Sequence, residues 1–221
     1  MIGHAQLRLG LASLIFTLVS GCQSKSIAQD KKGLLSQPAQ MAEAAVVGKK
    51  APNFTLKGVD GQPVSLSQFL GKIVVIEWFN PDCPFVKVAH GEGKLGQRAA
   101  THLQNGGVWL GVNSGAPGRQ GHGLERNKKA KAEYKIAYPI LLDEDGQVGR
   151  RYGAKRTPHI FIINAQGILV YAGALDSTGG AGYGTKPITD YLGLALAAIK
   201  SGTPLTTAAT KPWGCSVKYA Q

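Results

Sequence analysis

Continuous and alternating runs of apolar residues predict the strands of a sheet. A strand that is buried on both faces is uniformly apolar, whereas a half-buried strand alternates with polar residues. Uniform runs at residues 73–79 and 108–112 therefore predict two central strands, the first interrupted only by Glu77. Alternating segments on either side of Asp60-Gly61 predict a hairpin, because Asp-Gly favours a tight hairpin turn. The remaining predicted strands are 139–142 and a second hairpin, 159–163 with 168–171.

Helical patterns fill the gaps between these strands. The main predicted helices are 83–104, a basic helix at 124–135 and a closing amphipathic helix at 187–200, with short turns at 67–70 and 148–152. This order of elements is typical of an α/β sandwich of three layers, with a mixed central sheet and an N-terminal hairpin extension. The domain is expected to span residues 47–200, and residues 201–221 are expected to form a tail.

The first 46 residues lie outside this pattern. The apolar run 9–19 is too short for a bilayer core of about 30 Å and is typical of a signal peptide. It ends in Ser20-Gly21-Cys22, which resembles the bacterial lipobox. That resemblance implies a lipoprotein signal peptide at 1–22, with cleavage before Cys22 and lipidation of that residue. An ordinary signal peptide with an incidental cysteine is the alternative.

The expected location follows from this leader. Residues 23–46 show no apolar period and predict a flexible tether. We therefore expect a protein of the bacterial cell envelope that faces the periplasm and is held to the membrane by its lipid anchor. Gln23, directly after the lipidated position, favours the outer membrane by analogy with other lipoproteins.

Composition narrows the function classes. The 221 residues are 43% hydrophobic and 17% charged, which excludes a disordered chain, and three cysteines are too few for a small disulfide scaffold. A formal net charge of +12 favours anionic surroundings. The glycine-rich stretch 113–123 lacks the Lys-Ser/Thr ending of a phosphate-binding loop, and no paired metal-ligand spacing occurs. We expect no cofactor, no metal and no nucleic-acid partner.

The candidate chemistry gathers at residues 78–86, where a buried strand passes into a helix. Cys83 falls at the first turn of that helix, where free backbone N–H groups and the helix dipole favour a thiolate over a thiol. Pro84 supports this placement, because proline suits the first helical position. A lone cysteine is also commonly a small buried hydrophobe, but the polar neighbours Asn80 and Asp82 favour a reactive thiolate.

Several stretches, in the same order, resemble the redoxin branch of the thioredoxin-fold superfamily, which includes the peroxiredoxins of the alkyl hydroperoxide reductase and thiol-specific antioxidant group. The matching stretches are residues 48–54, 71–72, 83–86 (Cys-Pro-Phe-Val), 156–158 (Arg-Thr-Pro) and 214–219 (Gly-Cys-Ser-Val-Lys-Tyr). Cys-Pro-Phe-Val and the Gly-Cys-Ser-Val-Lys-Tyr ending together resemble one peroxiredoxin-like subgroup. The resemblance implies a thioredoxin-like fold for the domain.

The resemblance also assigns roles around the cysteine. Cys83 corresponds to the first, nucleophilic cysteine of the Cys-X-X-Cys motif, and Val86 stands at the second position. The motif therefore holds no resolving thiol. The peroxiredoxin pattern counted from Pro81 meets Phe85 and Val88 instead of Thr/Ser and Cys, so the standard peroxidatic motif is absent.

A substrate-binding edge is implied as well. Thr157-Pro158 corresponds to the cis-proline dipeptide of the family, whose first residue offers its backbone to an extended substrate. Arg156 and Pro84 complete the predicted substrate-binding residues. Glu77 corresponds to the buried acidic residue beneath the site, where it would exchange a proton with the thiol. A solvated edge position is the alternative for Glu77.

Cys215 supplies the missing thiol in this account. The tail is long enough to extend roughly 50 Å at about 3.3 Å per residue, so it can bring Cys215 to Cys83. Two non-lipidated cysteines in an exported protein tend to pair. A disulfide between them would be either the resolved state of a catalytic pair or a purely structural staple.

The sequence therefore predicts a thiol-dependent oxidoreductase with Cys83 as nucleophile and Cys215 as resolving cysteine. Its expected partners are a disulfide- or peroxide-containing substrate and an external thiol electron donor. The alternatives are a thiol peroxidase that reduces hydroperoxides and a non-catalytic thioredoxin-fold binding domain with a structural disulfide.

Overall fold

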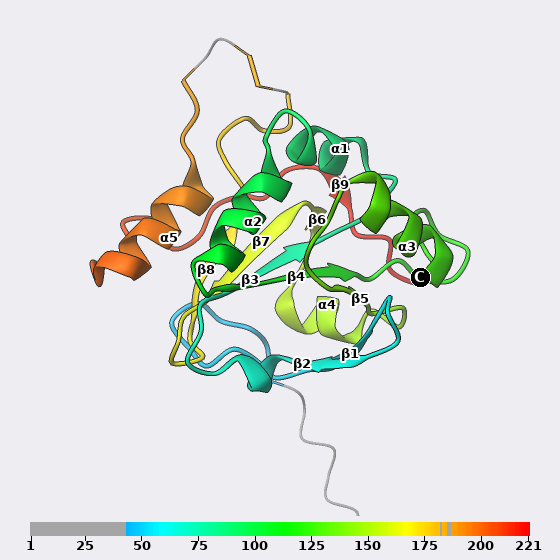
Figure 1. Ribbon diagram of the computed structural model, residues 1–221, viewed down its shortest axis with the longest axis horizontal. Helices are drawn as coiled ribbons and strands as arrows, with labels where there is room; N and C mark the ends of the chain where they lie inside the picture. The colour runs from blue at the N-terminus through cyan, green and yellow to red at the C-terminus, as the bar shows by residue number, and fades with distance from the viewer. Residues whose placement is uncertain (1–42, 182, 185–186) are drawn as a thin grey trace, which may run out of the picture. The chain divides into compact units, whose positions relative to one another are not determined.

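The computed structural model describes residues 43–181, 183–184 and 187–221 (Figure 1). The predicted signal peptide, the lipidation of Cys22 and all but the last four residues of the predicted tether lie outside the described residues. Contact with the domain begins at Ala45, whose N–H donates to the Arg151 carbonyl at 2.9 Å. None of the helices in the described ranges is long and apolar enough to cross a bilayer.

A seven-stranded mixed sheet forms the centre of the domain, in the order β2-β1-β5-β4-β3-β7-β8. The central strands β3, β4 and β5 run parallel, while β1 joins β5 and β7 joins β3 antiparallel. The strands are β1 Thr55–Gly58, β2 Pro63–Ser65, β3 Val74–Trp78, β4 Val108–Asn113, β5 Ile140–Leu142, β7 His159–Ile163 and β8 Leu169–Gly173. The predicted mixed sheet and N-terminal hairpin are confirmed.

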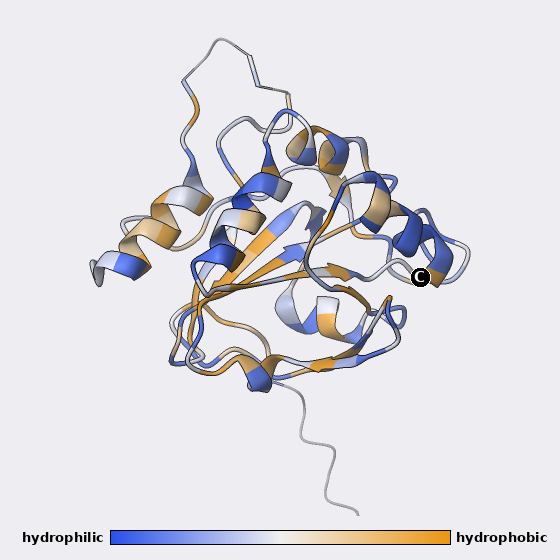
Figure 2. Cartoon of the chain, in the orientation of Figure 1, coloured by the Kyte–Doolittle hydropathy of each residue, from blue (hydrophilic) through white to orange (hydrophobic). Residues whose placement is uncertain are grey.

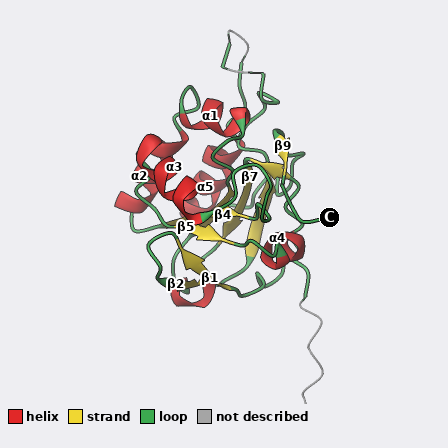
Figure 3. Cartoon of the chain, turned by 90° about the vertical axis from the view of Figure 1, so that its right-hand side faces the viewer, coloured by secondary structure: helices red, strands yellow, loops and turns green. Residues whose placement is uncertain are grey.

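Helices cover both faces of this sheet (Figures 1 and 3). Because side chains alternate along a strand, Val75 of β3 packs into one hydrophobic core and Ile76 into the other. The first core lies beneath four helices, α1 Pro84–His90, α2 Leu95–Gln104, α3 Leu124–Glu133 and α5 Tyr191–Ser201. The second lies beneath α4 Gln147–Tyr152 and the 3-10 turn η1 Leu66–Phe69. This is the predicted three-layer, thioredoxin-like sandwich.

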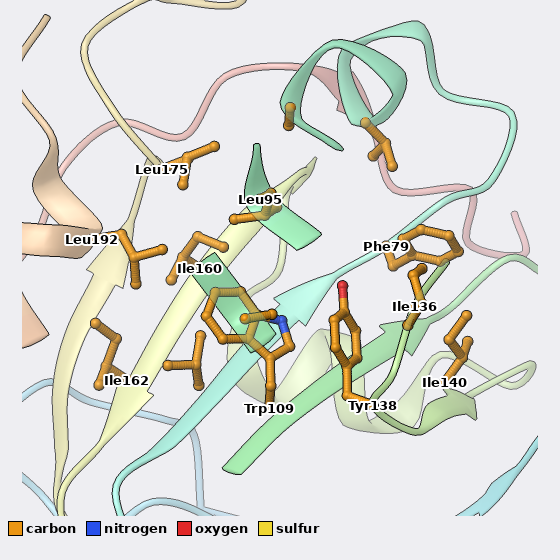
Figure 4. Close-up of a cluster of buried hydrophobic side chains, with 14 of the residues drawn as sticks. Phe79, Leu95, Trp109, Ile136, Tyr138, Ile140, Ile160, Ile162, Leu175 and Leu192 are labelled. Atoms are coloured by element: carbon orange, nitrogen blue, oxygen red, sulfur yellow. The ribbon is translucent and has the colours of Figure 1, made fainter. Parts of the chain in front are cut away.

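Hydropathy follows the layers. Figure 2 shows orange, hydrophobic residues along the strands of the central sheet and blue, hydrophilic residues on much of α3. The first core is shown in Figure 4, where Trp109 and Tyr138 stand side by side beneath the helices. Both of these aromatic side chains are at most 1% exposed.

The prediction of one helix from 83 to 104 is wrong. The chain leaves the helical conformation after His90 and re-enters it at Leu95. Gly91 caps the end of α1, and Lys94, just before α2, has a left-handed backbone with φ +50°. A Cβ on Gly93 would overlap the Tyr183 hydroxyl, so the break gives room to a close tertiary contact.

The start of the closing helix and the structure of the tail also differ from the predictions. The closing helix begins at Tyr191 instead of 187, because the Asp190 carboxylate caps it by accepting the Gly193 N–H at 2.8 Å. The tail also contains an unpredicted strand. β9, Cys215–Ser216, pairs antiparallel with β6, Arg156–Thr157, to form a separate two-stranded sheet.

Candidate active site

Cys83 lies at the junction of β3 and α1. Asn80 closes the turn before it, since its carbonyl accepts the Cys83 N–H at 3.1 Å and its side-chain oxygen accepts the Asp82 N–H at 2.9 Å. Cys83 is the N-cap of α1 and Pro84 is its first residue, as predicted. The thiol has no exposed surface, because it is enclosed by the core beneath the helices.

Side chains from α3 and from the residue that follows it hold the loop 80–82, just before Cys83, in place. The Arg126 guanidinium donates to the Asp82 carboxylate at 2.8 Å and to the Pro81 carbonyl at 3.2 Å. The Tyr134 hydroxyl donates to the same carbonyl at 2.9 Å. The sequence predicted only a basic helix here and gave no sign of these contacts. Arg126 of α3 and Tyr134, the residue that follows α3, hold the loop that delivers the nucleophile.

The cis-proline dipeptide faces the thiol. The Thr157-Pro158 peptide bond is cis, as the family resemblance implies. Thr157 is buried, and its carbonyl oxygen accepts a hydrogen bond from Cys83 Sγ at 3.1 Å. Arg156 directly precedes Thr157 and Pro84 directly follows Cys83, and the side chains of Arg156 and Pro84 are exposed. All four predicted substrate-binding residues are therefore at the site, and their binding of substrate stays a prediction.

Strand β9 brings the second thiol to the same place. Cys215 is the register partner of Thr157 and packs against the core that contains Cys83. Burial, and then a hydrogen bond and the negative charge of Cys83, raise the pKa of Cys215 to about 11. Both cysteines are free thiols. The tail thus carries the only other described cysteine into direct contact with Cys83, a pair separated by more than half of the chain.

Glu77 lies beneath this pair in a buried polar network. It has no exposed surface, and its carboxylate meets His90 Nε2 at 2.9 Å, the Tyr138 hydroxyl at 2.8 Å and Trp109 Nε1 at 3.4 Å. Burial and the Glu77 charge raise the pKa of Tyr138 well above its ordinary value. The alternative of a solvated edge position is therefore wrong. Proton exchange between Glu77 and Cys83 stays a prediction.

Sequence reasoning missed the partners of Glu77. No sequence signal marked His90 as a partner of Glu77, although its side chain is buried and its Nε2 lies 2.9 Å from the carboxylate. Tyr138 and Trp109, the other two partners of Glu77, are buried side chains in other parts of the chain, and no sequence pattern marked them as members of the network. Among the residues that the structure describes, no cluster of three His, Cys, Asp or Glu side chains has the arrangement of a metal site.

Comparisons with known proteins agree with this geometry. The model of the AhpC/TSA family matches residues 47–172. The thiol-disulfide oxidoreductase ResA of Bacillus subtilis is 29% identical over 129 residues, which are 58% of this chain and 67% of that protein. Chloroplastic peroxiredoxin Q of Oryza sativa subsp. japonica is 30% identical over 110 residues, 48% of this chain. The chain spans 45% of the length of that peroxiredoxin.

A solved structure shares most of the fold. The crystal structure of an uncharacterized conserved protein from Geobacillus kaustophilus superposes with a TM-score of 0.70 and 29% sequence identity. The superposition covers 79% of this chain and 93% of that one.

Proposed function

The chain belongs to the AhpC/TSA family, and from that premise we propose that it is a thiol-dependent oxidoreductase with Cys83 as nucleophile and Cys215 as resolving cysteine. One observation carries the proposal. Cys83 Sγ donates to the Thr157 carbonyl, and Thr157 pairs with Cys215, so both thiols meet at one backbone position. A nucleophilic thiol and a second thiol in contact with it are what reduction of a substrate disulfide through an internal disulfide requires.

The first step is attack by Cys83 on a substrate disulfide. The Cys83 thiolate forms a bond to one sulfur of the substrate, the substrate S–S bond breaks, and the other sulfur leaves as a thiolate. Cys83 makes this attack from the amino end of α1, where its Sγ lies 3.1 Å from the Thr157 carbonyl oxygen.

The second step is resolution by Cys215. Its sulfur attacks the Cys83 sulfur of the mixed disulfide, forms the Cys83–Cys215 bond and releases the remaining substrate thiolate. The substrate disulfide is thereby reduced by two electrons and the protein is oxidised by two. An external thiol donor then has to reduce the Cys83–Cys215 pair for another turnover.

A second candidate function is hydroperoxide reduction. The likeness to peroxiredoxin Q favours it. Here Cys83 would attack a peroxide oxygen, release an alcohol or water and become a sulfenic acid, with which Cys215 would condense to form the disulfide and water. The absence of the standard peroxidatic motif around Cys83 favours disulfide exchange as the main activity.

Rapid mixing of the reduced protein with a model disulfide and, separately, with hydrogen peroxide distinguishes the candidates. We expect the wild type to react faster with the disulfide, Cys83→Ser to lose the reaction, and Cys215→Ser to stop at the mixed disulfide. A faster reaction with peroxide would establish the peroxidase instead. Reaction of neither substrate faster than with free cysteine would leave a non-catalytic binding domain.

The location of the protein belongs to the same proposal. We propose that Cys22 carries a lipid anchor that holds the domain at the bacterial cell envelope, facing the periplasm. The lipobox-like sequence before Cys22 supports this, and Gln23 supports the outer membrane. Mass spectrometry of the native protein tests it: a chain that begins at an acylated Cys22 is expected, and an unmodified Cys22 contradicts it.

A further inference from the structure

Trp213 anchors the chain just before Cys215. Its indole ring is 8% exposed, and its Nε1–H donates to the Asp176 carbonyl at 3.0 Å. The ring also packs against Phe85 in the first turn of α1, with the ring centroids 6.3 Å apart. A large aromatic side chain with its N–H satisfied is a firm attachment point. It ties the tail to the same helix that carries Cys83 at its amino end.

Gly214 joins this anchor to Cys215 in a conformation that other residues avoid. Its φ is +113°, in the region that favours glycine. A Cβ at this position would overlap the Thr157 carbonyl oxygen, the atom that accepts the hydrogen bond from Cys83 Sγ. The absence of a side chain therefore lets the tail approach the backbone that contacts the nucleophile.

The chain is also held just after Cys215. The Val217 N–H donates to the Lys155 carbonyl at 3.3 Å, and the Lys218 carbonyl accepts the Ala116 N–H at 2.8 Å. The Tyr219 hydroxyl donates to the Ala154 carbonyl at 2.9 Å. Cys215 thus lies between two segments of the tail, each of which is held to the domain by its own contacts. Its location does not depend on the thiol itself.

From this arrangement we propose that Trp213 and Gly214 are positioning residues that hold the Cys215 sulfur against Cys83 for the resolution step. The inference rests on the proposed function, in which Cys215 attacks the Cys83 mixed disulfide. Cys215 loses its proton to solvent, its sulfur bonds to the Cys83 sulfur, and the bond from Cys83 to the substrate sulfur breaks, so the substrate leaves as a thiolate and the step needs no oxidant or reductant. Pre-positioning turns this attack into a fast intramolecular reaction.

A two-step release experiment tests this inference. The reduced protein is mixed with a chromogenic aromatic disulfide, whose first coloured thiolate is released by attack and whose second is released by resolution. Gly214→Ala is expected to slow the second release about 100-fold, as misplacement of a reacting group does. Trp213→Ala is expected to slow it about tenfold, whereas Trp213→Phe, which keeps the contact with Phe85, is expected to lie between Trp213→Ala and wild type.

Controls separate positioning from general damage. The first release is expected not to slow in any variant, because Cys83 itself is unchanged and a displaced tail uncovers its thiol, so a slower second release reports the resolution step. Ser216→Ala changes an exposed side chain beside Cys215 and is expected to release both thiolates at the wild-type rates. Second-release rates unchanged in both Gly214→Ala and Trp213→Ala would overturn the inference.

An equilibrium measurement keeps this test independent of catalysis. In a glutathione redox buffer, the equilibrium constant for closing the Cys83–Cys215 disulfide reports how well the fold holds the two sulfurs together. A tenfold loss in Trp213→Ala corresponds to about 30 mV in reduction potential. An unchanged reduction potential would contradict the positioning role. Failure of the wild type to attack the aromatic disulfide would instead refute the proposed function, and the equilibrium measurement would still test the positioning role.

Discussion

The two thiols occupy unlike surroundings. Cys83 is enclosed and hydrogen-bonded to the Thr157 carbonyl, whereas Cys215 is partly exposed on a two-residue strand. Burial and the proximity of Cys83 outweigh the opposing charges of Lys218 and Arg156, so the pKa of Cys215 rises to about 11. At neutral pH Cys215 is therefore protonated before Cys83 attacks the substrate, which is compatible with its role as the resolving thiol.

This difference predicts a pH dependence for resolution. The attacking species is the Cys215 thiolate. In the mixed disulfide Cys83 bears no charge, but burial, the largest cause, still raises the pKa of Cys215 above its ordinary value, so the thiolate population grows about tenfold per pH unit up to that value. The rate of mixed-disulfide resolution is therefore expected to rise steadily from pH 7 to pH 9. Rapid mixing of the preformed mixed disulfide with buffers of different pH measures it. A rate that levels off near pH 8 would contradict the account.

His159, directly after the cis-proline, predicts a second pH effect. Burial, and then the charge of Lys155, lower the pKa of His159 from 6.5 to about 3. Below pH 6.5 His159 becomes protonated in the unfolded chain but stays neutral in the folded protein, so the free energy of unfolding falls as the pH drops from 6.5 to 3. The loss from this residue is expected to reach at most about 5 kcal/mol.

Denaturant unfolding at several pH values tests this expectation. His159→Asn does not titrate and keeps a side-chain acceptor for the Lys155 N–H, which donates to His159 Nδ1 at 3.3 Å. Its free energy of unfolding is expected to vary less with pH between 3 and 6.5 than that of the wild type. Equal slopes for the two proteins would show that the acid sensitivity comes from other groups.

At the level of elements, β3 and α1 work as a unit. The strand carries Glu77 on the face that meets the first core, and His90 of the helix lies 2.9 Å from its carboxylate, so the two elements share a buried hydrogen bond beneath the nucleophile. Tyr138 and Trp109 satisfy the other carboxylate oxygen. Removal of the carboxylate would leave three buried donors without their acceptor.

The variant Glu77→Leu is therefore expected to lower the free energy of unfolding by about 2–4 kcal/mol. Glu77→Gln is the matched control, since its amide oxygen can still accept from Tyr138 and Trp109, and a smaller loss is expected. Urea unfolding of both variants measures the effect. Equal stability of Glu77→Leu and wild type would mean that the network contributes nothing to the fold.

Much of this arrangement was predictable from local patterns. Uniform apolar runs identified β3 and β4, Asp60-Gly61 identified the first hairpin, and the proline after Cys83 identified the start of α1. These signals reside within a few neighbouring residues. The contact between the two cysteines was predictable only as a possibility, because tail length and the family resemblance allowed it without fixing the path of the tail.

Other features depend on contacts between distant segments. The break between α1 and α2 accommodates Tyr183, and the pairing of β9 with β6 uses two strands of two residues each, too short to leave a periodic pattern. The fastening of the Cys83 loop by Arg126 joins positions far apart in the chain. None of these contacts has a local sequence signal, so a single sequence could not have revealed them.

For the whole molecule, the tail is part of the domain. It runs beside β8, where Thr210 bonds to Tyr171 and to the Ala174 N–H, and it ends near α4, where the Arg150 guanidinium lies 4.5 Å from the Tyr219 ring centroid. Between these points β9 occupies the backbone edge of Thr157. An extended substrate that uses this edge has to displace the tail.

Removal of residues 214–221 tests this covering role. Truncation retains the Trp213 anchor but exposes the Thr157 edge and the Cys83 thiol beneath it. The rate of Cys83 alkylation by iodoacetamide is expected to rise about tenfold or more, because reagent access no longer requires local opening. Cys215→Ser, which keeps the tail in place, is the control and is expected to stay slow. Equal rates in both variants would contradict the covering role.

The central claim is that Cys83 reacts first and Cys215 resolves it. Mass-spectrometric peptide mapping after a single turnover with a small model disulfide tests this claim most directly. The account predicts a Cys83–Cys215 disulfide in the wild type and an adduct retained on Cys83 in Cys215→Ser. An adduct found on Cys215 with Cys83 still a free thiol, in the wild type or in Cys83→Ser at the wild-type rate, would contradict it.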